Sequence, residues 1–236
     1  LVGSEMCIRD RAMVAMGRFG GAELGFGSDA DVIFVYRALG DDVNKAQAEA
    51  EALVSDIRRL CADQVLEFEL DLDLRPEGKN GPIVRSVDSY AAYYKRWAGT
   101  WESQALLRAR LISGAPAIVD AFVDLINQYR YPDSIDQAAI VEIRRIKARV
   151  EVERLPQGAD PKRHLKLGRG SISDVEWLVQ LFQLQHAKTY PQIQTPHTLP
   201  ALERMEACGL ISNSDARVLK EAWVISSSIR SSAMLY

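Results

Sequence analysis

The chain has 236 residues, of which 47% are hydrophobic and 26% are charged, a mixture typical of globular proteins. This composition excludes a chain that is disordered or of low complexity throughout, and the length allows one large domain or two small ones. The sequence contains no run of roughly 18 apolar residues, so it predicts neither a transmembrane helix nor a membrane partner.

Charge, cysteine and histidine content further restrict the functional classes and the compartment that fit this sequence. Lysine and arginine total 29, aspartate and glutamate total 32, and the formal net charge is −3. This balance argues against broad, non-specific nucleic-acid binding but is compatible with a local phosphate site. Cys7, Cys61 and Cys208 fit neither a disulfide framework nor a CxxC metal site, which favours a reducing, cytoplasmic compartment. The three histidines lack the spacing of a zinc hydrolase.

The two ends of the sequence look unlike the rest. Residues 1–11 (LVGSEMCIRDR) lack the apolar segment of a signal peptide and resemble a translated adapter, so we predict a non-native leader there. The final helical pattern reaches Tyr236 without a Gly or Pro stop signal. We therefore expect the C-terminal domain to be truncated.

The first part of the chain mixes strand and helix signals. Residues 13–16 and 32–36 are short apolar runs that predict buried strands. Residues 42–61 carry apolar side chains at three- and four-residue steps, which predicts an amphipathic helix. Residues 65–74 (VLEFELDLDL) end in strict alternation, which predicts a strand with leucines on one face and acids on the other.

The second part is read as helical throughout, because the strand signals stop after Gly81. We therefore predict an α+β fold, with a small mixed-sheet domain over residues 12–85 and an all-α domain over residues 86–236. The expected helices cover residues 86–97, 101–112, 117–129, 136–155, 173–187, 199–207 and 214–229.

The strongest chemical signal is a set of aspartates at the predicted strands. Asp29 and Asp31 are two residues apart at the start of a strand and therefore point to one face. Two such carboxylates repel each other unless a hard cation lies between them. Asp71, on the later acidic strand, is the best candidate for a third carboxylate, and three carboxylates can hold two Mg²⁺ ions. Asp73 is either a fourth ligand or a neighbour without a role.

Glycine and basic residues supply candidate phosphate contacts. The backbone at Gly20 and Gly21 carries no side chains and could approach a phosphate closely. Lys166 and Arg169 lie in a glycine-flanked segment before a predicted helix, where they could bind a phosphate or belong to a connector. Arg75 could bind a triphosphate or neutralise the acidic strand.

One further segment leaves two roles open. Ser173 and Glu176 fit a capping box at the start of a predicted helix. Asp174 and Glu176 could equally belong to a site.

The candidate site residues lie in three segments of the sequence, each of which resembles a motif of a known family. The pattern GG-x-EL-x(3)-SD-x-D resembles the nucleotidyltransferase motif of the DNA polymerase β superfamily. Over residues 13–234 the chain resembles the glutamine synthetase adenylyltransferase/adenylyl-removing family, most closely the C-terminal, adenylylating domain of actinobacterial members. The segments that carry this resemblance are MGRFGGAELGFGSDADVIFV, ELDLDLRPEGKNGPIVRS, and RRIKARVEVERLP followed by HLKLGRGSISDVEW.

The resemblance implies a polymerase β-like core followed by a helical bundle, and a Mg²⁺-dependent enzyme that moves AMP from ATP to a tyrosine of glutamine synthetase. In the full-length enzyme it also implies regulation by a P_II signalling protein. The implied metal-binding and catalytic residues are Asp29, Asp31 and Asp71. The residues expected to contact the nucleotide are Gly20, Gly21, Ser28, Arg75, Lys166 and Arg169.

Three other functions remain open on the sequence. The chain could be the deadenylylating domain of the same family, which releases ADP by phosphorolysis. It could be a nucleotidyltransferase that acts on a small molecule, although the long helical part favours a protein substrate. It could also be a non-catalytic interaction module, against which the three aspartates argue.

Overall fold

The structure is a computed structural model that describes residues 8–38, 41–62 and 68–235. The strands are β1 (Ile8–Ala15), β2 (Ala30–Ala38), β3 (Leu70–Asp71), β4 (Arg85–Ser86) and β5 (Arg110–Gly114). The α-helices are α1 (Gly17–Gly20), α2 (Val43–Cys61), α3 (Val87–Trp97), α4 (Thr100–Leu106), α5 (Pro116–Arg130), α6 (Gln137–Glu153), α7 (Ile172–His186), α8 (Thr198–Ala207) and α9 (Asn213–Ala233). No helix of the described residues is both long and apolar enough to cross a membrane.

The described residues divide into two compact units that are not continuous in sequence. The first contains Asp29–Tyr129 and the described residues up to Leu24. The second contains Gly25–Ser28 and the chain from Arg130 onward. The chain therefore enters the second unit twice, first as a four-residue loop and then as the helical part.

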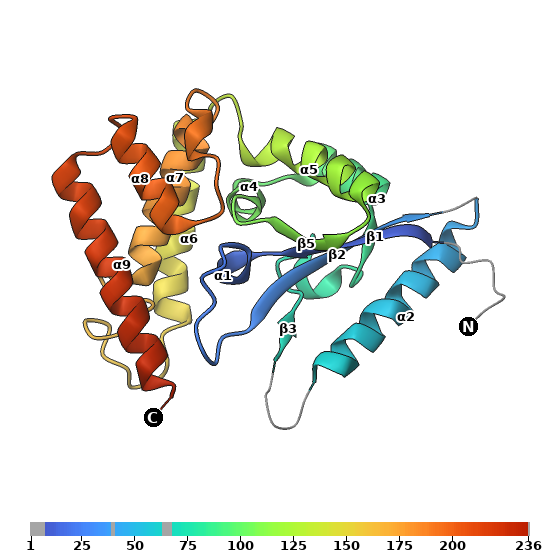
Figure 1. The fold of residues 1–236 in the computed structure, drawn as a ribbon, viewed down its shortest axis with the longest axis horizontal. Coiled ribbons are helices and arrows are strands. Elements are labelled where there is room, and N and C mark those ends of the chain that lie inside the picture. Colours follow the sequence, from blue (N-terminus) through green and yellow to red (C-terminus); the bar gives the residue numbers. More distant parts are fainter. Residues whose placement is uncertain (1–7, 39–40, 63–67, 236) are drawn as a thin grey trace. The chain divides into compact units, whose positions relative to one another are not determined.

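The first unit is built on a mixed sheet. Its strand order is β3-β2-β1-β5, and β4 also pairs with β2. The pairs β1–β2 and β1–β5 are antiparallel, whereas β3 and β4 both run parallel to β2. β1 and β2 are the two central strands of this sheet (Figure 1). β2 consists mainly of the β-branched and aromatic residues that favour strands. The predicted α+β fold with a small mixed sheet and a helical part is confirmed.

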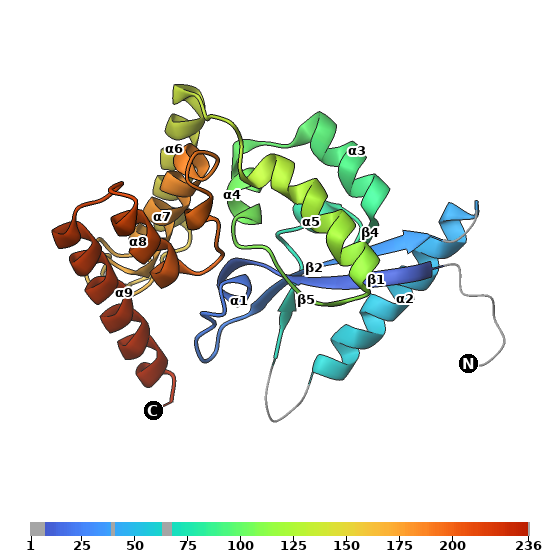
Figure 2. The ribbon, with the colours of Figure 1, turned by 45° about the horizontal axis from the view of Figure 1, so that its top comes forward.

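Helices cover both faces of this sheet (Figures 1 and 2). Alternate residues of β2 point to opposite faces. Ile33 and Val35 pack in one apolar cluster with buried residues of α3, α4 and α5, whereas Val32 and Phe34 pack in a second cluster with those of α2. Both faces of the sheet are therefore buried in apolar clusters.

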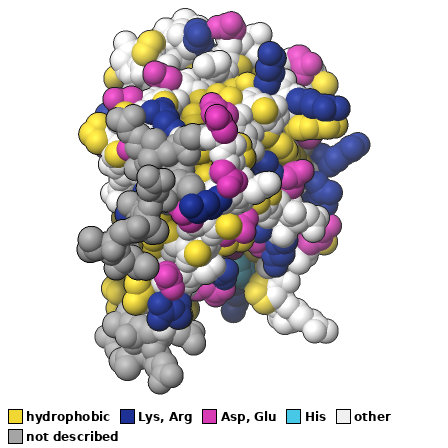
Figure 3. Space-filling view, turned by 90° about the vertical axis from the view of Figure 1, so that its right-hand side faces the viewer, with side chains coloured by type: hydrophobic (Ala, Val, Ile, Leu, Met, Phe, Trp, Pro, Cys, Tyr) yellow, Lys and Arg dark blue, Asp and Glu magenta, His cyan; other side chains and the backbone are white. Residues whose placement is uncertain are grey.

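Local signals explain the helices that cover the sheet. Asp42 caps α2 by accepting a hydrogen bond from the backbone N–H of Lys45 at 3.0 Å. The buried face of α2 carries Ala46, Ala50 and Val54 at four-residue steps, so this long helix packs closely on the sheet. Its outer face is mixed, with exposed charged residues as well as the exposed Val43 and Leu60 near its two ends. Figure 3 shows acidic and basic side chains interspersed on one face of the molecule.

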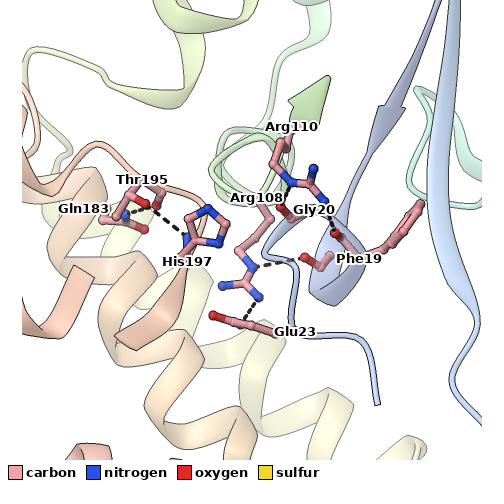
Figure 4. A network of polar contacts seen from close by, with 9 residues as sticks. Phe19, Gly20, Glu23, Arg108, Arg110, Gln183, Thr195 and His197 are labelled. Atoms are coloured by element: carbon pink, nitrogen blue, oxygen red, sulfur yellow. Dashed lines mark hydrogen bonds and ion pairs between the residues drawn. The ribbon is translucent and has the colours of Figure 1, made fainter. Parts of the chain in front are cut away.

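The second unit is helical apart from its loops. Ser212 caps α9 by accepting a hydrogen bond from the Asp215 N–H at 3.1 Å, and Asp136 caps α6 in the same way. The buried Gln183 of α7 donates to the carbonyl oxygens of Ile193 and Thr195 at 2.8 and 2.7 Å, which fixes the loop before α8 (Figure 4).

One predicted helix is wrong in its second half. The expected helix over residues 101–112 ends at Leu106, and Arg110–Gly114 instead form β5. The pairing of β5 with β1 favours the strand, because the carbonyl and N–H groups of β1 would otherwise lack a partner on that side. The prediction that strand signals stop after Gly81 is wrong for the same reason.

Two other predictions differ from the observed boundaries. The boundary expected between residues 85 and 86 falls inside the first unit, since α3, α4 and α5 share a core with the sheet. Of the predicted leader, residues 1–7 lie outside the described residues, and residues 8–11 form part of β1 and pair with β2.

The predicted strand over residues 65–74 is much shorter than expected. Within its described residues only Leu70–Asp71 pair as β3, and residues 65–67 lie outside the described part. Leu70 and Leu72 pack beside α2 as the alternation predicts, but Leu74 packs in the cluster on the other face. The turn that follows Leu72 reverses the direction of this last leucine.

Candidate active site

The predicted carboxylates lie at one end of β2 and β3. The parallel register aligns Asp31 with Asp71, and Ala30 with Leu70. Aligned residues of neighbouring strands point to the same face, and neighbouring strands are about 4.8 Å apart. Because Leu70 packs beside α2, Asp31 and Asp71 share the opposite face. Asp29 immediately precedes β2 and is exposed.

Gly17 makes room for the Asp31 carboxylate. This glycine has a φ of +49°, and a Cβ atom at its position would overlap the Asp31 carboxylate. The Met16 N–H donates to the Asp31 carbonyl oxygen at 2.8 Å, which holds the two segments together. Sequence reasoning did not select Gly17, although a glycine directly after an apolar run was its visible signal.

Asp71 and Asp73 have different surroundings. The Asp73 N–H donates to Asp71 Oδ1 at 2.7 Å, so the turn itself orients the Asp71 carboxylate. The Asp73 carboxylate lies 3.4 Å from Lys79 Nζ and 3.7 Å from Arg75 Nη1. Two cations thus neutralise Asp73, which favours the interpretation that it is a neighbour and not a fourth ligand.

Asp71 and Asp73 line a polar pocket along β3, whereas Asp29 and Asp31 are not among its lining residues. The pocket has a volume of about 310 Å³ and contains both negative and positive groups. Its lining residues are Arg58, Glu69, Leu70, Asp71, Leu72, Asp73, Arg75, Lys79 and Ile83. A pocket of this character suits an anion that binds together with a cation.

Arg75 is buried, and its side-chain N–H groups donate to backbone carbonyl oxygens of the loop that contains it. Its Nη1 donates to Leu72 O at 2.8 Å, and its Nε donates to Gly81 O at 3.1 Å. Its Nη2 donates to Lys79 O at 3.3 Å. These contacts favour the structural alternative, in which Arg75 shapes the pocket wall. A contact of Arg75 with triphosphate stays a prediction.

The double glycine is packed against an arginine. A Cβ atom at Gly20 would overlap the carbonyl oxygen of Arg108 and lie 2.7 Å from Ala15 O. A Cβ atom at Gly21 would lie 2.6 Å from Arg108 Cζ. Internal packing thus accounts for both glycines, and their predicted approach to a phosphate stays a prediction.

Two arginines hold this turn (Figure 4). Arg108 donates from Nε to Gly17 O at 3.1 Å and pairs through Nη2 with the Glu23 carboxylate. Arg110 donates to Gly20 O at 2.8 Å and to Phe19 O at 3.0 Å. Both arginines were placed inside the predicted helix over residues 101–112, so sequence reasoning missed them.

The donor chemistry of the three aspartates fits Mg²⁺, because hard cations prefer carboxylate oxygens. The space at Gly17 that admits the Asp31 carboxylate supports this fit. In the part of the chain that the structure describes, no group of three or more His, Cys, Asp or Glu side chains is placed to hold a metal ion.

Three predicted nucleotide contacts belong to the second unit. Ser28 Oγ accepts a hydrogen bond from Arg230 Nη1 of α9 at 2.9 Å. Lys166 and Arg169 are exposed residues of the segment before α7. Their predicted role in nucleotide binding concerns groups in two different units and stays a prediction.

Asp174 makes contacts with α6 and with the segment before α7, which favour a structural role. Its carboxylate pairs with Lys147 of α6 and accepts a hydrogen bond from the Gly170 N–H at 2.6 Å. Burial would lower the pKa of Lys147, but hydrogen bonds to Asp174 and Glu151 outweigh this and hold that pKa above its ordinary value. The N-cap of α7 is Ser171, so the predicted capping box that begins at Ser173 is wrong by two residues.

A Lys147→Met variant tests the structural role of Asp174. We expect the thermal midpoint to fall by roughly 2–6 °C, because two partly buried carboxylates lose their shared cation. The matched control is Lys188→Met, whose pair with Asp133 is exposed and should shift the midpoint little. An unchanged midpoint in Lys147→Met, measured by calorimetry, contradicts the structural role.

A second pair of variants separates Asp71 from Asp73. For the AMP transfer that the sequence resemblance implies, Asp71→Asn should lower the rate by about 100-fold or more, because Asp71 is aligned with Asp31. Asp73→Asn should change it by less than about threefold, since it removes the ion pairs with Lys79 and Arg75 but keeps the backbone N–H that holds Asp71. Initial rates at saturating ATP measure both, and equal losses would make Asp73 a ligand.

The comparisons with known proteins identify the family. A family model described as glutamate-ammonia ligase adenylyltransferase matches residues 6–124, just over half of the chain. The chain belongs to the glutamate-ammonia ligase adenylyltransferase family. A second model, described as GlnD PII-uridylyltransferase, matches residues 144–232. The family resemblance seen in the sequence is confirmed.

Relatives within the glutamate-ammonia ligase adenylyltransferase family come from several actinobacteria. Proteins named bifunctional glutamine synthetase adenylyltransferase/adenylyl-removing enzyme are 56% identical over 225 residues in Leifsonia xyli subsp. xyli and 53% over 230 residues in Streptomyces avermitilis. The protein of that name in Mycobacterium tuberculosis H37Rv is 46% identical over 228 residues. Each match covers 95% of this chain but only 22–23% of the relative. The chain thus spans less than a quarter of their length.

Proposed function

We propose that this chain carries a Mg²⁺-dependent adenylyltransferase site that moves AMP from ATP to a tyrosine hydroxyl of glutamine synthetase. One observation carries the proposal. In a member of the glutamate-ammonia ligase adenylyltransferase family, the β2–β3 register places Asp31 beside Asp71 on one face of the sheet. The names of the relatives support the transfer of an adenylyl group to glutamine synthetase.

The aspartates would hold the metal in this reaction. Asp31 and Asp71, with Asp29 beside them, would bind Mg²⁺ through carboxylate oxygens. When bound, Mg²⁺ neutralises phosphate charge and lowers the pKa of the attacking hydroxyl. Gly17 and the Met16 N–H fix the Asp31 side of the site, and the Asp73 N–H fixes the Asp71 carboxylate. The protein would thus supply preoriented oxygen ligands on a rigid sheet.

The bond changes are those of an in-line displacement. The tyrosine oxygen forms a bond to the α-phosphorus of ATP, and the bond between that phosphorus and the oxygen bridging to the β-phosphate breaks. Pyrophosphate leaves, and the hydroxyl proton passes to solvent. Arg58 and Lys79 line the pocket beside Asp71 and offer positive charge to the phosphates. No covalent enzyme intermediate is required.

The reverse activity is the second candidate, because the relatives are also named adenylyl-removing enzymes. In that reaction phosphate attacks the tyrosine-bound AMP and ADP leaves. The same carboxylates would serve both reactions. A P_II protein is a proposed regulator of the full-length enzyme, and a reducing cytoplasm is its proposed location.

The experiment incubates the purified chain with α-labelled ATP, Mg²⁺ and unmodified glutamine synthetase. Label on a synthetase tyrosine, lost in Asp31→Asn, supports the adenylylating function. Release of ADP from adenylylated synthetase and phosphate, without forward transfer, supports the removing function. A folded chain with neither activity and no Mg²⁺-dependent ATP binding would favour a non-catalytic module.

A further inference from the structure

Arg108, Arg110 and Glu23 contact or flank the short helix α1. The helix α1 has four residues, and helices of this length are not stable without contacts from outside. Arg108 and Arg110 provide such contacts from the segment that leads into β5. Arg108 lies in the turn that follows α4 and Arg110 is the first residue of β5, and both guanidinium groups donate to carbonyl oxygens of α1.

The contacts fix the backbone of the turn at three carbonyl groups. Arg110 binds the carbonyl oxygens of Phe19 and Gly20, at 3.0 and 2.8 Å. Arg108 binds Gly17 O at 3.1 Å, and its Glu23 partner belongs to the segment that follows the turn. The Arg108 side chain is 5% exposed and the Glu23 side chain is 8% exposed, so this pair lies in the interior.

Gly17 links this interior pair to the candidate metal site. Its carbonyl oxygen accepts the hydrogen bond from Arg108, while its Cα faces the Asp31 carboxylate so closely that a Cβ atom would not fit. A movement of Gly17 therefore changes the space available to that carboxylate. Packing is tight enough here that a shift of a few tenths of an ångström would be felt.

We infer that Arg108 is a positioning residue for Asp31, acting through Gly17, and that Arg110 supports the same turn. This inference rests on the proposed function for its kinetic part. The outer partners of metal-binding residues commonly change metal affinity or activity by about 10–100-fold when they are altered. A guanidinium suits this role because its fixed, planar donors can bind a carbonyl and a carboxylate at once.

The test compares Arg108→Lys with Arg59→Lys in the whole chain. Lysine keeps the positive charge beside Glu23 but lacks the fixed Nε donor to Gly17 O. We expect the kcat for AMP transfer to fall about 10–100-fold and the half-saturating Mg²⁺ concentration to rise several-fold, with a similar thermal midpoint. Arg59 is an exposed residue of α2, so the same replacement there should change none of these values.

Hydrogen exchange of the backbone gives a readout without metal or substrate. Amides of residues 16–22 should exchange faster in Arg108→Lys than in the unaltered chain, and at the same rate in Arg59→Lys. Arg110→Lys is the second variant, since Arg110 is only partly buried and its replacement should preserve folding. It should speed exchange at the same amides and lower kcat less.

The outcomes separate this inference from the proposed function. Normal kcat and Mg²⁺ dependence in Arg108→Lys overturn the positioning role, as does a loss of folded protein with unchanged kcat per folded molecule. If the unaltered chain catalyses neither transfer nor phosphorolysis, the proposed function fails and hydrogen exchange alone decides whether the arginines hold the turn. Unchanged exchange then overturns the inference.

Discussion

An Asp31→Asn variant is expected to lose AMP transfer by about 1,000-fold while it keeps the fold. Asparagine has nearly the same shape but carries no charge, so it weakens the proposed hold on Mg²⁺, which contributes several kcal/mol to such reactions. Asp31 lies in register with Asp71 and against Gly17, and its side chain is not part of the apolar clusters. The initial rate of label transfer to glutamine synthetase measures the effect.

The control for this variant is Asp56→Asn. Asp56 lies on α2, is exposed and pairs only with Arg59 among the ion pairs of the described residues, so its replacement should leave the rate within about twofold. Calorimetry should give nearly equal thermal midpoints for both variants and the unaltered chain. Near-normal transfer by folded Asp31→Asn would remove Asp31 from the catalytic machinery and with it the proposed carboxylate site.

A Gly17→Ala variant is expected to lower transfer by about 100-fold, without any change in charge or donors. The added Cβ atom would overlap the Asp31 carboxylate, so that either this carboxylate or the turn must move. Displacement of a reacting group by about 1 Å can cost about 100-fold in rate. The positive φ of +49° adds backbone strain of about 1 kcal/mol, which should lower the thermal midpoint by a few degrees.

Gly209→Ala separates the backbone strain from the overlap. Gly209 has a φ of +70°, but a Cβ atom there would meet nothing within 4 Å. This variant should therefore lose a few degrees of thermal midpoint and keep its rate of transfer. If Gly17→Ala and Gly209→Ala show equal rates, the space that Gly17 leaves for Asp31 has no catalytic importance.

The sequence is informative where local patterns decide the structure. The β-branched run after Asp31 and the four-residue spacing along α2 both correspond to observed elements, because burial favours the same periodicity that the sequence shows. The aspartates could be found for a similar reason. Charged residues at the start of an apolar strand are conspicuous, and the segments around them are typical of one family.

The contacts that support the site could not be predicted in the same way. Arg108 and Arg110 follow a helical pattern, and in a helix residues two apart do not face each other. The pairing of β5 with β1, far away in sequence, places Arg110, and Arg108 lies in the turn between α4 and β5. The acidic strand ends after Asp71 for a comparable reason, since the hydrogen bonds of Arg75 turn the chain there.

The discontinuity of the two units has a consequence for dissecting this protein. The loop Gly25–Ser28 belongs to the helical unit, and Asp29 follows it directly. A hydrogen bond joins Ser28 to Arg230, across 202 positions of the sequence. A truncation after Tyr129 would therefore separate this loop from the helical unit to which it belongs. A minimal domain would need either the helices in full or a redesigned connection into the strand that carries Asp31.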